Sequence, residues 1–432
     1  MRSLFNFLFN AITRSGFVLV IALLSVNYLP NQLFKDFPLE PLATKPVDFD
    51  SVIPEWNSKL SDGDPEFIQV NNINGPESIA IAPNGLLYTG LADGRLVELN
   101  PSKQYQMRTV LRIKDQPGQL ACKDNVATRA ECGRLLQLRF VNGTLFGVEA
   151  NSGLYMLDIK TGSKILLGPK PLAKVNIYNS FVFDPKEPNI VYMTISSTKW
   201  NIVQIMWSIL EHESSAKVIA FDVKTGKRVV LTDNRMMVNG IDVDVKRDRL
   251  VFAETMEGRV STMSLKQVRA AFRQAQDGEI LRGLDTKTLI PTTPGNVDNI
   301  VIEGDLAYLA LPFVKRHGSE FSDHTASMPK VRKAMCRAIY LVGKALEYVA
   351  LNFYNHPMLE LAYNDFLSGH IVYRTLNSQS SAVLEYNLAT GATRFFGSET
   401  FGFVSEAVPD KSGNLYMGSF RSPFLVKQKL PA

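Results

Sequence analysis

Five oxygen-bearing side chains stand where short apolar strands begin, in widely separated parts of the chain. They are Glu77, Asn179, Asn239, Asp298 and Asn299. Two carboxylates with three amide oxygens form a set of hard ligands whose number and charge suit Ca²⁺. Sulfur and imidazole are absent from these positions, which argues against zinc or copper. The sequence predicts a calcium site, and the plain alternative is that Asn and Asp simply begin turns before strands.

A sixth strand start carries Glu406, with apolar Val404 and Val408 nearby. A carboxyl group that faces an enclosed channel among apolar neighbours has a raised pKa and can serve as a general acid or base. Because the longer Glu side chain follows Ser405 where the other starts offer Asn or Asp, we expect Glu406 to share the channel with the metal without ligating it. No GxSxG motif occurs and the five histidines lie away from the strand starts, which disfavours a serine hydrolase.

These residues belong to a sequence pattern that recurs along the chain. Each copy has a short apolar strand, a turn, a strand that resembles LYTG, and a further strand that ends near Gly, Leu and Asp. Six copies begin at Gly75, Cys132, Asn179, Val238, Val297 and Ser405. Four short strands per unit of about 45 to 60 residues are typical of propeller blades, which cover their faces only when neighbours close a ring. The prediction is an all-β fold, a six-bladed β-propeller over residues 65–432. Phe67–Val70 is expected to complete the last blade as a strand from the other end of the chain.

The N-terminal segment reads as a membrane signal. The stretch from Gly16 to Phe34 carries no charge, and Arg2 and Arg14 precede it. We expect residues 1–35 to be a cytosolic tail and a signal-anchor transmembrane helix, although a cleaved signal peptide is the alternative. Arginine before the span places the rest of the chain on the lumenal or extracellular side, as in a single-pass type II membrane protein. Residues 36–64, rich in Pro and acidic residues, are expected to form a stalk.

Two features fit that side of the membrane. Asn142 begins the sequence Asn-Gly-Thr, an N-glycosylation acceptor. Cys122 and Cys132, two of only three cysteines, can form a disulfide in an oxidising compartment, and Cys336 is expected to stay a free, buried thiol. The 47 basic and 42 acidic residues leave a formal charge of only +5 without basic runs, which makes a nucleic-acid partner unlikely.

One long helical segment is expected inside the propeller, at about residues 327–357. Its apolar residues follow a helical period at Val331, Met335, Ala338, Ile339, Val342, Leu346, Val349 and Leu351. Its basic residues, among them Arg332 and Arg337, lie largely elsewhere on the helix. Such a basic amphipathic helix can pack on the blades or contact the bilayer surface, and the sequence leaves both open.

Several motifs together resemble one known family, the strictosidine synthase-like family. They include GPESIAI, LLYTGLADGR, CGRLLQLRF, FDVKTG, VNGIDV and GSFRSPFL, in this order along nearly the whole chain. The resemblance implies a six-bladed propeller, and for animal members it implies type II membrane glycoproteins with arylesterase-type activity, related more distantly to paraoxonases and gluconolactonases. It implies calcium ligands at the five strand-start residues and a catalytic base at Glu406. The paraoxonase histidine pair has no counterpart, since Arg134 and Leu135 occupy the region where one histidine would fall.

Two hypotheses about function follow. The first is a Ca²⁺-dependent hydrolase of aryl esters or lactones, a small-molecule ester enzyme in which Glu406 moves protons. The second is a non-catalytic, membrane-tethered interaction module in which Ca²⁺ or the polar strand starts only stabilise the fold. Strictosidine synthesis itself is disfavoured, because animal proteins have no evident supply of its two substrates.

Overall fold

The structure, a computed structural model, describes residues 23–48, 52, 60–61, 65–114, 132–314, 321–375, 381–398 and 401–430. These residues divide into two compact units, and each is considered by itself. The helical unit takes its described residues from 1–46, 204–213 and 321–376, and the β unit takes the others. The helical segment expected inside the propeller therefore belongs to a unit of its own, together with the first part of the predicted stalk.

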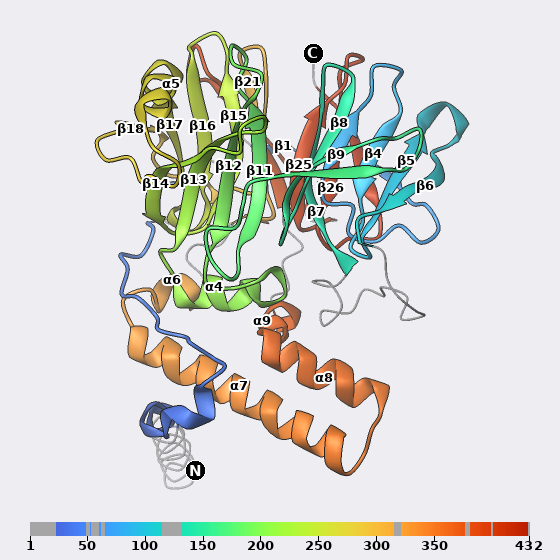
Figure 1. Cartoon of the computed structure of the whole chain (residues 1–432). Coiled ribbons are helices and arrows are strands. Elements are labelled where there is room, and N and C mark those ends of the chain that lie inside the picture. Colours follow the sequence, from blue (N-terminus) through green and yellow to red (C-terminus); the bar gives the residue numbers. More distant parts are fainter. Residues whose placement is uncertain are drawn as a thin grey trace, which may run out of the picture. The chain divides into compact units, whose positions relative to one another are not determined.

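The β unit consists of four-stranded antiparallel sheets that follow one another along the chain (Figure 1). Sheet 1 holds β3 (Ile79–Ile81), β4 (Leu87–Gly90), β5 (Arg95–Asn100) and β6 (Gln106–Arg112); sheet 2 holds β7 (Leu135–Val141), β8 (Thr144–Glu149), β9 (Gly153–Leu157) and β10 (Lys164–Gly168). Sheet 3 holds β11 (Ile177–Phe183), β12 (Ile190–Ser197), β13 (Ala216–Asp222) and β14 (Arg228–Arg235); sheet 4 holds β15 (Val238–Asp244), β16 (Arg249–Glu254), β17 (Arg259–Ser264) and β18 (Thr286–Ile290).

The remaining sheets combine strands that lie far apart in the sequence. Sheet 5 holds β20 (Ile300–Glu303), β21 (Leu306–Leu311), β23 (Ser381–Asn387) and β24 (Thr393–Ser398), with the short β1 (Leu60–Ser61) parallel to β24; sheet 6 holds β25 (Val404–Pro409), β26 (Asn414–Ser419), β27 (Leu425–Lys429) and β2 (Glu66–Ile68). A small pair joins β19 (Gly295–Asn296) to β22 (Phe313–Val314). Because β2 pairs with β27, Phe67 lies opposite Val426, and the predicted closure of the last sheet by an N-terminal strand is confirmed.

The first strands of the six sheets contact one another in a closed cycle, β3 to β7, β11, β15, β20, β25 and back to β3. Each sheet thus presents its first strand to the centre of a ring, which is a propeller-type arrangement. The prediction of an all-β fold is confirmed for this unit.

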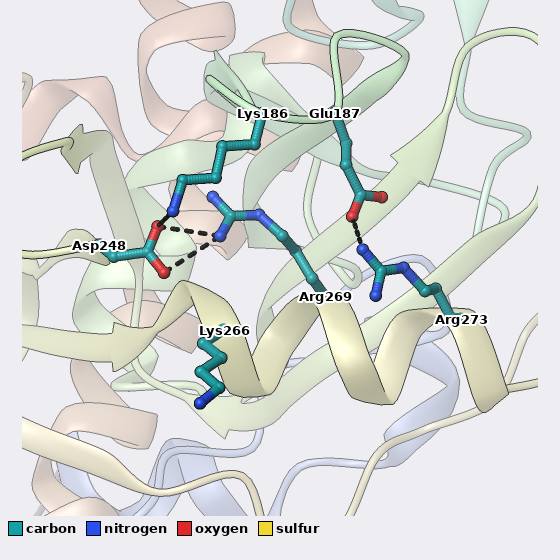
Figure 2. A pocket seen from close by; sticks show the side chains of 6 residues that line it. All are labelled: Lys186, Glu187, Asp248, Lys266, Arg269 and Arg273. Carbon is teal, nitrogen blue, oxygen red and sulfur yellow. Dashed lines mark hydrogen bonds and ion pairs between the residues drawn. The ribbon is translucent and has the colours of Figure 1, made fainter.

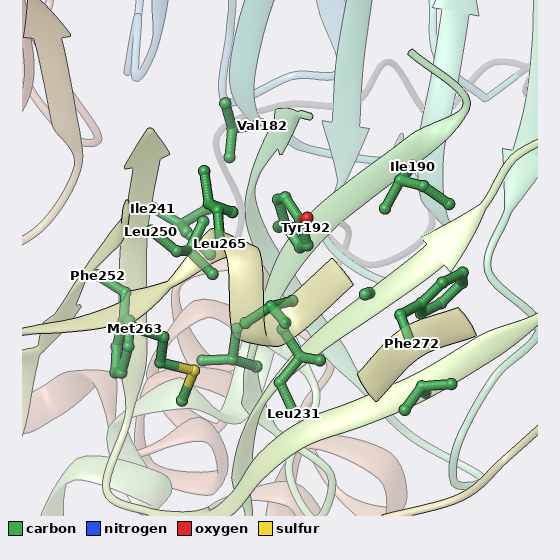
Figure 3. Packing of buried hydrophobic residues seen from close by; sticks show 14 of the residues in the cluster. Val182, Ile190, Tyr192, Leu231, Ile241, Leu250, Phe252, Met263, Leu265 and Phe272 are labelled. Carbon is green, nitrogen blue, oxygen red and sulfur yellow. The ribbon is translucent and has the colours of Figure 1, made fainter. Parts of the chain in front are cut away.

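Buried apolar side chains lie between neighbouring sheets rather than at the centre of the ring. Between sheets 3 and 4, for example, Tyr192, Ile241, Phe252 and Leu265 pack together (Figure 3). Alternation along each strand directs every second side chain to one face, so a single four-stranded sheet buries its apolar residues only against the next sheet. The centre is left to the polar residues at the strand starts.

Helices are few in the β unit and dominate the other. The β unit holds η3 (Pro101–Lys103), η6 (Thr255–Glu257) and α5 (Leu265–Gln274); the helical unit holds η1 (Val26–Tyr28), η2 (Asn31–Phe34), α4 (Ile205–Glu211), α6 (Phe321–His324), α7 (Pro329–Asn352), α8 (Pro357–Ser368) and α9 (His370–Thr375), and η5 (Ile202–Gln204) directly precedes α4. The predicted helix at 327–357 is thus present as α7, and α8 and α9 extend the helical region beyond the predicted end.

The buried face of α7 includes two of its basic residues. Arg332 and Arg337 are buried, whereas Val342 and Val349 are exposed. The Arg332 guanidinium donates to backbone carbonyl oxygens, including that of Leu210 at 2.9 Å, so its buried charge is hydrogen-bonded. The expectation that the basic residues lie away from the packed side is therefore wrong for these two arginines.

The segment after the predicted membrane span packs inside the helical unit. Phe37 stacks on Tyr340 with ring centroids 4.3 Å apart and meets Trp207 edge to face at 4.9 Å. Leu39 is also buried. The described start of the region predicted as a stalk is therefore part of a packed core.

The predicted span does not continue to Phe34. Leu29 is extended (ψ 149°) and Pro30 follows it, so the helical turns before and after this point are separate. Within the described residues, no helix is both long and apolar enough to cross a membrane. The signal-anchor helix predicted in residues 1–35 stays a prediction, because residues 1–22 lie outside the described part of the chain.

Candidate active site at the strand starts

The first strands of several sheets carry a β-bulge close to their starts. The pairing shifts between Leu135 and Gln137 in β7, between Tyr178 and Phe181 in β11, between Val238 and Ile241 in β15, and between Val404 and Glu406 in β25. A bulge inserts an extra residue and re-aims the neighbouring side chains. Asn179 and Asn239 lie inside such bulges, so both depart from the regular alternation of the strand.

Hydrogen bonds join the strand starts of different sheets. Ser405 Oγ donates to the carbonyl oxygen of Glu77 at 2.6 Å, and the Asn299 N–H donates to the Ser405 carbonyl at 3.0 Å. The Gly240 N–H donates to the Asp298 carbonyl at 3.0 Å. The structure thus brings the starts of sheets 1, 4, 5 and 6 together, and Asn179 is buried in the corresponding bulge of sheet 3.

The carboxylates at this centre repel one another. Asp298 is buried, and burial raises its pKa well above the usual value, with further increases from the charges of Glu77 and Glu406. A hydrogen bond with Asn239 and the charge of Arg134 oppose the rise. A buried group of acidic residues with this electrostatic pattern favours a proton or a cation.

Arg134 is a member of the site that the sequence suggested only as a departure from the paraoxonase pattern. It lies directly before β7, and its Nε donates to Glu77 Oε2 at 2.5 Å in a buried ion pair. Its Nη2 donates to the Phe420 carbonyl at 2.8 Å. Arg134 therefore fixes the Glu77 carboxylate from the side of sheet 2.

Some buried polar atoms at the centre have no partner among the described residues. They are Asn239 Oδ1, Asn299 Oδ1 and Arg134 Nη1. Each unpartnered buried polar atom costs roughly 1 to 3 kcal/mol, so a cluster of them indicates a polar or charged occupant. In the described part of the chain, no three or more His, Cys, Asp or Glu side chains lie close enough to hold a metal by themselves. A cation here would need amide oxygens among its ligands, and the two unpartnered Asn oxygens fit that need.

Glu406 is almost completely buried beside this cluster. Its Oε2 accepts from Ser78 Oγ at 2.6 Å and from the Ile79 N–H at 2.6 Å, both in sheet 1. Burial raises the pKa of Glu406 to about 7, although these two hydrogen bonds and the charge of Arg139 oppose the rise. The predicted combination of an enclosed carboxyl and a raised pKa is therefore present.

The position of Glu406 has a counterpart in sheet 2. Gln137 Oε1 accepts from Ser180 Oγ at 2.9 Å and from the Phe181 N–H at 2.6 Å in sheet 3, which repeats the contacts of Glu406 with sheet 1. Both side chains therefore join one sheet to the next. The residue of sheet 6 that corresponds to Glu77 and Asn179 is Ser405, and Glu406 lies one position further along the strand.

Arg139 crosses the centre of the ring from β7. Its Nη1 donates to Asp242 Oδ2 at 3.0 Å, and its Nη2 donates to the carbonyl oxygens of Ile241 and Ile300. Asp242 also accepts from the Ile302 N–H at 2.8 Å. This ion pair links sheets 2, 4 and 5 across the ring. This ion pair was not predicted, because the two residues are 103 positions apart in the sequence.

The modification residues lie elsewhere. Asn142 is exposed in the two-residue turn between β7 and β8, with the positive φ of 49° that such hairpin turns require. Cys132 is disulfide-bonded and Cys336 is free and buried. Cys122 lies outside the described residues, so its pairing with Cys132 stays a prediction.

A separate pocket of about 320 Å³ lies between α5 and the turns after β11 and β15 (Figure 2). Arg269 donates to both carboxylate oxygens of Asp248, and Arg273 pairs with Glu187. Because these charged groups are largely paired with one another, we interpret them as the ion pairs that attach α5 to sheets 3 and 4.

Comparison with known proteins places this geometry in context. Residues 182–267 match the sequence model of the strictosidine synthase family, and residues 56–99 match that of the strictosidine synthase-like N-terminal region. The resemblance to the strictosidine synthase-like family is confirmed. The chain is 26% identical to the rat adipocyte plasma membrane-associated protein, with 96% of this chain and 99% of that protein covered. It is 25% identical to strictosidine synthase-like protein 4 of Arabidopsis thaliana, with 91% and 88% covered.

A solved structure supports the fold. A gluconolactonase from Xanthomonas campestris aligns with 91% of this chain and 97% of its own, with a TM-score of 0.50 and 11% sequence identity. At this identity the likeness concerns the arrangement of sheets, and it agrees with the propeller-type ring described above.

Proposed function

We propose that the chain is a six-bladed β-propeller hydrolase that acts on aryl esters or lactones and binds Ca²⁺ at the strand starts. The observation that carries the proposal is the buried cluster at the centre of the ring, where Glu77 and Asp298 meet the unpartnered oxygens of Asn239 and Asn299. Arylesterase-type chemistry is what the family resemblance implies, and a polar site at the centre of a ring suits a small substrate.

Glu77, Asn179, Asn239, Asp298 and Asn299 would hold the calcium ion. Bound Ca²⁺ supplies Lewis-acid polarisation of a substrate carbonyl oxygen. Asp298 must lose its proton to act as a ligand, and its raised pKa therefore makes calcium binding favour higher pH. Arg134 holds Glu77 in place, and its unpartnered Nη1 is a donor for an oxygen atom of the substrate.

Glu406 would move the protons of the reaction. A pKa of about 7 leaves the carboxyl group able both to take a proton from water and to return one near neutral pH. Ser78 and the Ile79 N–H hold Oε2 at a fixed position, which orients the group. Water enters from the side of the strand starts, because Arg139 and Asp242 bridge the ring beyond them.

For the location of the protein, we propose a single-pass type II membrane protein of the endoplasmic reticulum or plasma membrane, anchored by the apolar N-terminal segment, with the propeller lumenal or extracellular. The rat relative is named as a plasma membrane-associated protein, which supports this placement. The exposed turn at Asn142 is accessible to a glycan, and the oxidised state of Cys132 suits the same compartment.

The experiment that tests the activity is hydrolysis of phenyl acetate by the purified full-length protein in detergent. We expect turnover to be lost with a calcium chelator and restored by added Ca²⁺, but not by Mg²⁺, whose octahedral preference this amide-rich site does not meet. Turnover that is unaffected by chelation, or never above the rate of the buffer, would contradict the proposal.

A second candidate is the non-catalytic interaction module. The observation that favours it is the equivalence of Glu406 and Gln137, since a side chain that only joins two sheets needs no acid–base chemistry. Under this alternative, calcium raises the thermal stability of the protein, and substitution of Glu406 leaves any esterase activity unchanged.

A further inference from the structure

The turn between α7 and α8 exposes large apolar side chains. Leu351, Phe353 and Met358 are each 72–75% exposed, and Tyr348 and Tyr354 are more than 60% exposed. We call residues 348–361 the helical tip. Isolated exposed apolar residues are normal on proteins, but a group of this size within fourteen successive residues indicates a surface that something else covers.

The helical tip is also almost without charge. Residues 348–359 contain no Lys, Arg, Asp or Glu, so Glu360 is the one charged residue in the sequence of the helical tip. A solvent-exposed turn between two helices usually carries charged or small polar residues, because they are hydrated at no cost. This composition is typical of a segment that is transferred from water into apolar surroundings.

The exposed surface continues along α7 rather than being folded inward. Val342 and Val349 follow the helical period of the apolar residues, yet both are exposed, while Arg332 and Arg337 on the other side are buried. The Arg337 guanidinium lies 4.2 Å from the centroid of the Phe34 ring and donates to the Asn27 carbonyl at 3.1 Å. The side of α7 that is buried in the helical unit thus includes these two arginines, whereas the apolar residues toward the end of α7, Val342, Val349 and Leu351, are exposed.

The N-terminal end of the described chain favours one kind of partner. The charge-free run that begins at Gly16 continues to Phe34, and its described part belongs to the helical unit. Tyr28 and Leu33, two exposed large side chains in the later part of that run, belong to the same unit as the helical tip. If the run enters a bilayer, the helical unit is the part of the protein at the bilayer surface.

We propose that the helical tip inserts into the interfacial region of a lipid bilayer. Aromatic and aliphatic side chains on amphipathic segments lie roughly 5 to 10 Å deep, at the boundary between headgroups and acyl chains. The tyrosines suit the headgroup level, where a ring is in apolar surroundings and its hydroxyl is in water. This contact is independent of the proposed hydrolysis, and it gives the anchored protein a second, fixed point on the membrane.

The test uses the full-length protein in liposomes of phosphatidylcholine, with bromine on part of the acyl chains at shallow positions. Phe353→Trp places a reporter on the helical tip. Met328→Trp is the matched control, since Met328 is half-exposed at the other end of α7, about 36 Å away for a helix of 24 residues. We expect the added Phe353→Trp emission to move to shorter wavelength and to fall by about half with brominated lipid, and the Met328→Trp emission to stay unquenched.

Several outcomes would overturn the inference. Unquenched, long-wavelength emission from Phe353→Trp means that the helical tip stays in water. Unquenched emission at short wavelength means that protein covers it, and a dependence on protein concentration would then identify a second copy. Equal quenching of both variants means that α7 lies flat on the bilayer and that the helical tip has no special role.

Discussion

At the scale of single residues, the comparison of Glu406 with Gln137 separates packing from chemistry. Both side chains accept a serine hydroxyl and a backbone N–H from the next sheet, so a glutamine performs the joining role naturally in this fold. What glutamine cannot do is exchange a proton. An isosteric substitution at Glu406 therefore removes the chemistry and keeps the contact.

We predict that Glu406→Gln lowers phenyl acetate turnover by about 100-fold or more, which is typical for loss of a general acid or base. The melting temperature should not fall, because the new amide oxygen can accept the same two hydrogen bonds. Ser78→Ala is the comparison: it removes the joining contact and one of the two hydrogen bonds that orient Glu406 but keeps the carboxyl group, so we expect it to lower the melting temperature and to reduce turnover less than Glu406→Gln does. If Glu406→Gln retained full turnover, the proton-transfer role would be wrong.

The raised pKa of Glu406 also predicts how stability depends on pH. The folded pKa of about 7 exceeds the usual value of 4.5, so the folded protein binds the proton more tightly than the unfolded chain does. This contribution to stability is fully present below pH 4.5 and is lost as the pH rises through 7. In chemical denaturation from pH 5 to 8 without calcium, the free energy of unfolding should fall less in Glu406→Gln than in the wild type. Identical slopes would contradict the assigned pKa.

Substitution of Arg139 provides an independent test of the pKa of Glu406. Its positive charge lowers the pKa of Glu406, so Arg139→Gln should raise that pKa further. The lower midpoint of the pH profile of kcat/KM should then move to higher pH, because the base must be ionised. Arg139→Lys keeps the charge and is expected to leave the midpoint near the wild-type value. A shift of the same size in both variants would indicate general disturbance of the ring rather than the charge.

At the scale of elements, the bulged strand starts decide which side chains meet. Gly240 allows β15 to approach β20 closely, since a Cβ atom there would lie 2.4 Å from the Ile300 nitrogen and 2.6 Å from the Asp298 carbonyl oxygen. The neighbouring Asn239 and Asp298 depend on this approach. The backbone conformation of Gly240 is an ordinary one, so glycine is required here because there is no room for a Cβ atom.

We predict that Gly240→Ala destabilises the fold by about 1 to 3 kcal/mol, the usual cost of overpacking, and weakens calcium binding. Thermal melting and calcium titration measure the two effects. Gly226→Ala is the control: its Cβ would meet nothing within 4 Å, but its φ of +77° disfavours alanine. That variant should lose stability while its calcium affinity stays unchanged. Unaltered calcium affinity in Gly240→Ala would mean that the close approach does not shape the site.

The same elements explain how far the sequence could predict the structure. The recurring sequence pattern predicted the sheets and the closing strand Glu66–Ile68, because turn residues and alternating apolar runs are local signals. It missed the exact place of Glu406, since a bulge changes the register by one residue without a mark in the sequence. It also missed the ion pairs of Arg134 and Arg139, which depend on sheets that meet only when the ring closes.

Helical periodicity likewise had limits. The period located α7 correctly, but it assigned the buried face by polarity alone. Arg332 is buried because carbonyl oxygens from three different segments, at Leu42, Leu210 and residues 325–326, accept from its guanidinium, and such acceptors cannot be read from the helix itself. The predicted membrane span was similarly extended too far, since it included residues up to Phe34 although the helical turn before Leu29 ends ahead of Pro30.

At the scale of the whole molecule, a ring of sheets surrounds one polar centre. Hydrophobic contacts between neighbouring sheets hold the ring, and polar residues from opposite sheets meet where the first strands begin. The central claim is that this meeting point binds Ca²⁺. Since the proposed ligands come from sheets 1, 3, 4 and 5, calcium should stabilise the ring as well as supply chemistry.

The most direct test is calorimetric titration of Ca²⁺ into the metal-free, full-length protein and into Glu77→Gln, with thermal melting of both. Glu303→Gln, which neutralises an exposed carboxylate at the end of β20, is the matched control. The account predicts one site, a calcium-dependent rise in melting temperature for the wild type and Glu303→Gln, and an affinity at least tenfold weaker for Glu77→Gln, about 1.4 kcal/mol or more. Equal calcium affinity in Glu77→Gln and the wild type, or no binding to the wild type, would contradict it.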